Sequence, residues 1–99
     1  TLKSLGIDIR NINDDDAKNR SKLIDKSGVI IKKIDPNGVM SLLAVRPGDA
    51  IVALQNTPIK NARDFEKKLK KLISSGSKSI LLTIVDLQNS TRYIGVKIK

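Results

Sequence analysis

The chain has 99 residues, of which 19 are Lys or Arg and 10 are Asp or Glu, and it contains no His and no Cys. A chain of this length supports one hydrophobic core, so we expect residues 1–99 to form a single domain. Without His and Cys, the chain cannot assemble a Ser-His-Asp triad, a Cys nucleophile or a zinc site with nitrogen or sulfur ligands. The composition therefore favours a non-catalytic domain with no cofactor and no metal.

The basic charge is concentrated in the second half of the chain. Residues 1–50 carry nine basic and seven acidic groups, whereas residues 51–99 carry ten and three. With one Phe and one Tyr, the chain offers little for stacking on bases, which disfavours recognition of single-stranded nucleic acid. The apolar runs are too short to span a bilayer. The start at Thr1 without Met indicates a processed chain or an excised fragment.

The first elements are a short strand and a helix. Apolar Leu5, Ile7 and Ile9 alternate with Gly6 and Asp8. This period of two predicts a strand at about Ile7–Arg10 with one face buried. Asn13 is a good N-cap, and the three Asp residues after it suit the first turn of a helix. We expect this helix to reach about Leu23.

The middle of the chain is predicted to form strands separated by turns. Residues rich in β-branched side chains predict strands, and Pro, Asn, Gly and Asp predict the turns between them. The expected elements are a strand at Gly28–Ile34, a turn at Pro36–Gly38, a helical turn at Val39–Leu43, a turn at Arg46–Asp49, a strand at Ala50–Leu54 and a connection at Gln55–Thr57 into Pro58–Ile59.

The clearest helix begins after Asn61. Its apolar residues fall on one stripe of about 100°, and four lysines cover the opposite side. Ser74–Ser77 ends it, and strands at Ile80–Val85 and Arg92–Ile98 follow. About five short strands capped by two helices predict an α+β, mainly β, domain built as a small, partly open β-barrel or sandwich. The stripe consists of Ala62, Phe65, Leu69, Leu72 and Ile73, and the lysines are Lys67, Lys68, Lys70 and Lys71.

Three features in this order resemble PDZ domains of the bacterial HtrA/Deg serine proteases. They are Ser4-Leu5-Gly6-Ile7 opening the first strand, Gly28-Val29-Ile30-Ile31 followed by Pro36-Asn37-Gly38 and by Arg46-Pro47-Gly48-Asp49-Ala50-Ile51, and the late helix before a closing strand pair. The resemblance covers about residues 5–98. Its first element is the Leu-Gly-Ile segment, which is similar to the circularly permuted order of bacterial PDZ domains.

The sequence departs from the family pattern at three places. Ala44 stands where Gly is common, Met40–Leu43 replaces a small-residue stretch, and Asp86–Asn89 lacks the usual Arg and Gly. The last departure resembles the second, C-terminal PDZ domain of a protease with two such domains. We therefore expect that position in the parent chain.

The resemblance implies a module that captures C-terminal or extended hydrophobic peptides by β-strand addition and so regulates or feeds a protease domain involved in protein quality control. Leu5, Gly6 and Ile7 would form the carboxylate loop, because Gly lets backbone approach closely. Lys3 would attract the carboxylate. The expected peptide-binding residues are Ser4, Leu5, Gly6, Ile7, Asp8 and Ile9 on one side and Phe65, Leu69, Leu72 and Ile73 on the helix.

Two rival functions stay open. In one, the domain assembles with the protease domain or with other PDZ domains of the same protein and takes no free peptide. In the other, the lysines of the late helix hold nucleic acid or anionic lipid, with binding that falls steeply with salt. The scarcity of aromatic residues and the short apolar runs predict no nucleic-acid partner and no transmembrane segment. The resemblance implies a serine endopeptidase as parent chain and a location in the periplasm or cell envelope.

Each candidate motif also has a plainer interpretation. The apolar residues of the first strand and the late helix also suit the core, and the lysines suit a solvated face. Asp14–Asp16 lacks the spacing of a calcium loop. Ser75–Lys78 matches a Ser-x-x-Lys pattern but suits a turn, and Asn19–Ser21 and Asn89–Thr91 match the glycosylation pattern by chance. We also expect Leu5→Asp or Gly6→Val to abolish peptide binding without disturbing the fold.

Overall fold

The structure is a computed structural model that describes residues 5–98 of the chain. Its strands form one antiparallel sheet in the order β1-β2-β3-β5-β6, with the short β4 paired to β3. The sheet does not close on itself, so β1 and β6 are its two edges. The strands are β1 (Ile7–Asn11), β2 (Val29–Ile34), β3 (Ala50–Leu54), β4 (Thr57–Pro58), β5 (Ser79–Val85) and β6 (Thr91–Lys97).

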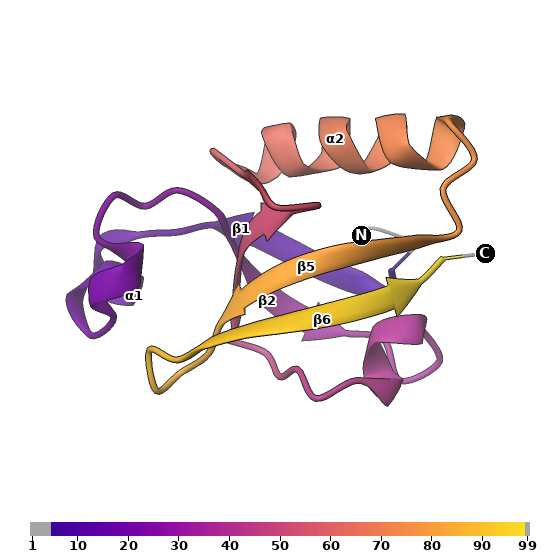
Figure 1. The fold of residues 1–99 in the computed structure, drawn as a ribbon. Helices are drawn as coiled ribbons and strands as arrows, with labels where there is room; N and C mark the ends of the chain where they lie inside the picture. The colour runs from indigo at the N-terminus through magenta and orange to yellow at the C-terminus, as the bar shows by residue number, and fades with distance from the viewer. Residues whose placement is uncertain (1–4, 99) are drawn as a thin grey trace.

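Two α-helices and two short 3-10 helices complete the described part of the chain. They are α1 (Asp14–Lys18), η1 (Ser21–Leu23), η2 (Val39–Leu42) and α2 (Ala62–Ser74). Figure 1 shows α2 lying along one side of the sheet, with α1 at one end. This α+β architecture confirms the predicted fold class, with β4 as a sixth, two-residue strand.

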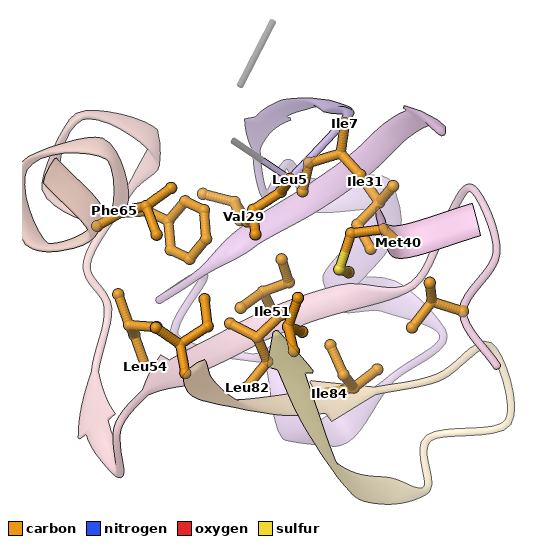
Figure 2. Packing of buried hydrophobic residues seen from close by; sticks show 14 of the residues in the cluster. Leu5, Ile7, Val29, Ile31, Met40, Ile51, Leu54, Phe65, Leu82 and Ile84 are labelled. Atoms are coloured by element: carbon orange, nitrogen blue, oxygen red, sulfur yellow. The ribbon is translucent and has the colours of Figure 1, made fainter. Parts of the chain in front are cut away.

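The hydrophobic core lies on both faces of the sheet. Val29 and Ile31 belong to the larger cluster, whereas Ile30, between them, belongs to a second cluster with Ala50 and Val85. Because successive side chains of a strand point to opposite faces, α2 and η2 cover one face and the α1–η1 segment covers part of the other. Figure 2 shows the larger cluster, in which Phe65 approaches the sheet from α2.

The helix predicted from Asn13 to about Leu23 is much shorter than expected. Asn13 caps it in the predicted manner, with its side chain accepting a hydrogen bond from the Asp16 N–H, but α1 ends at Lys18. Arg20 then takes an extended conformation and donates a hydrogen bond to the Gly48 carbonyl at 2.8 Å. This contact of the buried Arg20 links segments far apart in the sequence and outweighs local helix propensity. Leu23, a few residues later, lies in the core.

The late helix and the turn before it follow the sequence pattern. Asn61 caps α2, and Phe65 and Leu69 are buried on its inner side. Gln55 and Asn56 have φ of 53° and 62°, the left-handed pair that a two-residue hairpin turn requires. In β6, Val96 is buried and Ile94 packs against the core, as does Ile98 just after the strand, which agrees with the predicted alternation.

Candidate functional site

The strand β1 presents an edge of the sheet beside α2. β1 pairs with β2 on one side, and no described strand pairs with its other edge. At its C-terminal end the Asn11 side-chain oxygen accepts a hydrogen bond of 2.7 Å from the Ala62 N–H at the start of α2. An unpaired strand edge with a helix fixed beside it is the arrangement into which a further extended chain can add.

The loop before β1 has its carbonyl groups turned into the protein. The Leu5 carbonyl accepts a hydrogen bond from the Met40 N–H at 3.3 Å, and the Gly6 carbonyl accepts one from the Asp35 N–H at 2.7 Å. The N–H groups of Leu5 and Gly6 donate to no group within residues 5–98. With the acceptors engaged and the donors unused, the loop has the polarity needed to hold an anionic group.

Two glycines allow this arrangement. Gly6 has φ +70°, in the left-handed region, and a Cβ on it would lie 2.7 Å from the Gly38 Cα. A Cβ on Gly38 would lie 2.8 Å from the Gly6 Cα and 3.3 Å from the Leu5 carbonyl oxygen. The turn before η2 therefore packs directly against the Leu5–Gly6 loop. The sequence predicts a turn at Gly38 but does not predict its contact with Gly6.

The structure brings most of the predicted site residues together, largely as core. Leu5, Ile7, Phe65 and Leu69 are between 0% and 3% exposed and share one cluster. In Figure 2 the Phe65 ring points toward Val29 and Leu5. The plainer interpretation, that these side chains are core residues, therefore applies to all four.

The remaining predicted residues are more accessible. Ile9 and Leu72 are partly buried against the cluster, Asp8 is half-buried, and Ile73 is 39% exposed and lies outside the cluster. Ser4 lies outside the described residues, as does Lys3.

The burial of Leu5 corrects one expectation. Leu5→Asp would place a carboxylate inside the core, where an unpaired charge is strongly destabilising, so this substitution cannot leave the fold intact. Gly6→Val would add both a strained φ and a backbone clash.

A basic residue that sequence analysis did not single out lies near the loop. A cavity of about 290 Å³ is lined by Gly6, Ile7, Lys33 and Pro36, among others. Lys33 is exposed and pairs in register with Asp8 across the β1–β2 ladder. Its position could have been inferred only from that pairing, which brings residues 25 positions apart to one site.

A carboxylate–guanidinium network fixes the far end of β1. Arg10 donates two hydrogen bonds to Asp16, at 2.6 and 3.0 Å, and the Asn13 N–H donates a third at 2.9 Å. The bonds from Arg10 lower the pKa of the Asp16 carboxyl, although burial opposes this shift. Arg20 lies 3.8 Å from the same carboxylate. This network holds α1 against the end of β1.

Within residues 5–98, no group of three or more Asp or Glu side chains is placed to hold a metal ion. No described helix is both long and apolar enough to cross a membrane.

Curated relatives of the chain are proteins named probable periplasmic serine endoprotease DegP-like. The one from Brucella suis biovar 1 is 30% identical over 74 residues, which cover 75% of this chain and 14% of that protein. The one from Chlamydia pneumoniae is 26% identical over 96 residues, covering 97% of this chain and 19% of that protein. No family model matches the chain. The chain thus spans less than a fifth of the length of these relatives.

Solved structures with the same fold include the HtrA3 PDZ domain bound to a phage-derived ligand. It has a TM-score of 0.70 and 18% identity, over 96% of this chain and 84% of that one. The chain is a PDZ domain of the HtrA family. The HtrA-type protease AlgW, solved with a decapeptide, matches with a TM-score of 0.68 and 12% identity, over 94% of this chain and 27% of that one. Since the chain matches only 14% of the Brucella suis protease and its structural match of similar length is a PDZ domain, this chain is a non-catalytic domain.

Proposed function

We propose that this PDZ domain binds the C-terminal end of hydrophobic peptides as an added strand on β1. The observation that carries the proposal is the Leu5–Gly6 loop, whose carbonyls are engaged and whose N–H groups have no acceptor within residues 5–98. A terminal carboxylate would accept those hydrogen bonds, and charge-assisted bonds of this kind are stronger than neutral ones. The peptide backbone would continue along the free edge of β1.

The direction of the peptide follows from the elements around it. An added antiparallel strand would run from the Asn11 end of β1, where β1 meets the start of α2, and would end at Gly6. Five strand residues span about 16 Å, and the same length of α2 from Ala62 reaches about Leu72. The last side chain of the peptide would therefore lie near Leu69, Leu72 and Ile73. All three are aliphatic, so it should be apolar.

The parent protein would be a periplasmic serine protease, as the names of the relatives suggest. There, peptide capture on β1 would feed or regulate a protease domain outside this chain. We also propose that the domain is the second PDZ domain of that protein. Assembly with neighbouring domains of the same protein is the alternative function. The assembly role requires no affinity for free peptides.

The test is a titration of the isotope-labelled 99-residue chain with a peptide library carrying free C-termini, followed by amide chemical shifts. Peptide capture predicts shifts at Leu5–Ile9 and along Leu69–Ile73. A C-terminally amidated copy of each bound peptide is the matched control, and it should bind at least about tenfold more weakly because the carboxylate is lost. If no peptide moves these amides, the strand-addition proposal is wrong and the assembly role becomes the better explanation.

A further inference from the structure

A second recess lies on α2, away from β1. It has a volume of about 250 Å³ and is bounded by Leu54, Gln55 and Thr57 on the β3–β4 hairpin and by Lys68, Lys71 and Leu72 on the helix, with Ser75 at its end. No residue of β1 lines it. Of the residues assigned above to peptide binding, it shares only Leu72.

The hairpin wall of this recess is firmly held. The Gln55 N–H donates to the Leu81 carbonyl at 2.8 Å, and the Gln55 side-chain oxygen accepts from the Leu81 N–H at 2.6 Å. The turn is thereby fixed to β5 by two hydrogen bonds. Leu54 is 2% exposed and forms part of the core, so the floor of the recess is apolar and fixed.

The helix wall carries positive charge at the rim. Lys68, Lys71, Leu72 and Ser75 are separated by three, one and three residues, which places them on one face of α2. Lys68 is held by Asp64 at 2.7 Å. Lys71 is exposed, and within residues 5–98 no carboxylate forms an ion pair with it.

The negative end of the α2 dipole does not cancel this charge. The Leu72 carbonyl accepts hydrogen bonds from the Ser75 hydroxyl and the Ser77 N–H. The Lys71 carbonyl accepts one from the Ser75 N–H, and the Ile73 carbonyl accepts one from the Gly76 N–H. With these carbonyls engaged, the ammonium of Lys71 dominates the rim.

The size of the recess limits its occupant. Sites for small molecules usually span about 300–1,000 Å³. A recess of about 250 Å³ instead suits one side chain of a polypeptide. The apolar floor selects an aliphatic side chain, and the cationic rim selects a carboxylate beside it.

We propose that this recess is a second docking site, which binds a short acidic segment of a partner polypeptide through one aliphatic side chain against Leu54 and Leu72 and a neighbouring carboxylate on Lys71. The exposed Lys67, one helical turn before Lys71 on α2, extends the positive field and would steer such a segment toward the recess. The site is independent of the strand edge on β1.

The probe is the peptide acetyl-Glu-Asp-Leu-Asp-Glu-amide, whose blocked end cannot use the Leu5–Gly6 loop. Titrated into the labelled 99-residue chain, it should shift the amides of Gln55, Thr57, Lys71 and Ser75 and leave those of Leu5–Ile9 in place. Replacing its Leu by Ser should abolish these shifts. Shifts at Leu5–Ile9 in their place, or equal binding of the Ser peptide, would overturn the proposal.

Two variants separate docking from general charge attraction. Lys71→Glu should weaken binding of the probe about fivefold, because reversal replaces an attraction by a repulsion at the rim. Lys70→Glu makes the same change of charge on the next residue, outside the recess, and should weaken binding less than about twofold. Both side chains are exposed, so neither substitution disturbs the core. Equal losses would show that the peptide is held only by the net charge of α2.

A second probe, decanoate, distinguishes a protein segment from a free amphiphile of similar chemistry. The proposal expects decanoate to bind more weakly than the peptide. Tighter binding of decanoate at Gln55, Thr57 and Lys71 would assign the recess to a fatty acid and contradict a polypeptide partner.

Discussion

Gly6 and Gly38 lie so close that a Cβ on either would come within 2.8 Å of the other's Cα. The two residues are 32 positions apart, and their contact sets the distance between the Leu5–Gly6 loop and the turn that leads into η2. Of the two, Gly38 has φ −88°, which any residue adopts, so a substitution there tests the contact without adding backbone strain.

Gly38→Ala should therefore push the Leu5–Gly6 loop out of place. We expect the free energy of unfolding to fall by about 1–3 kcal/mol, and peptide affinity on β1 to fall at least about tenfold. Urea unfolding and a peptide titration measure the two effects. Gly95→Ala is the control, since a Cβ on Gly95 meets nothing within 4 Å. If Gly38→Ala proved as neutral as the control, the close contact would not position the loop.

Asp16→Asn should remove a pH-dependent part of the stability. Because Arg10 lowers the folded-state pKa of Asp16 below 3.8, its contribution is present above about pH 4 and is lost as the pH falls through the lowered pKa. We expect a loss of about 1–2 kcal/mol at pH 7 that shrinks as the pH falls through the lowered pKa. Urea unfolding as a function of pH measures it.

The control for that series is Asp15→Asn, one residue earlier in the same helix turn and exposed. It should change the stability little at any pH. A loss for Asp16→Asn that stayed constant from pH 7 to pH 2 would mean that shape, and not charge, explains the effect.

Phe65→Ala should severely destabilise the domain. The ring is fully buried in the larger cluster, and removing a buried aromatic side chain costs about 3–5 kcal/mol. Ile73→Ala, at a residue 39% exposed on the same helix, should cost less than about 1 kcal/mol. Urea denaturation compares the two. Similar costs would mean that Phe65 lines an open groove and not the core.

Replacing Lys67, Lys68, Lys70 and Lys71 together by Gln should leave peptide affinity on β1 within about threefold of the unchanged chain. These side chains lie on the outer surface and on the flank of α2 that carries the second recess, and they line no part of the β1 edge. Peptide titrations at 50 and 300 mM salt are the measurement. A large loss that depends on salt would show that the lysines attract the peptide itself.

Residues with strong local signals could be placed from the sequence. The stripe of α2 and the alternation of β6 each repeat one physical preference along a continuous segment. Both appear in the structure as predicted, except that Ile73 lies outside the core cluster. The end of α1 could not be placed, because it depends on Arg20 reaching Gly48, 28 residues away. Local propensity contains no information about such a contact.

The candidate site was predictable only in part for the same reason. The Leu5–Gly6 loop carried a recognisable pattern. Its support by Gly38, however, comes from a contact with the turn before η2, and its neighbour Lys33 is placed by pairing of β1 with β2. Whether an apolar residue of α2 lies in the core or at its border also depends on the neighbouring strands. Phe65 and Ile73 look alike in the sequence and differ in the structure by 39 percentage points of exposure.

The long connection between β1 and β2 affects how the domain folds. β5 and β6 are joined by five residues, whereas 17 residues separate the paired strands β1 and β2. Because the entropic cost of closing a loop rises with its length, we expect the β5–β6 hairpin to form before β1 pairs with β2. A chain in which β1 is not yet paired would lack the edge on which we propose peptide binding, so binding of a peptide would report the pairing of β1 with β2.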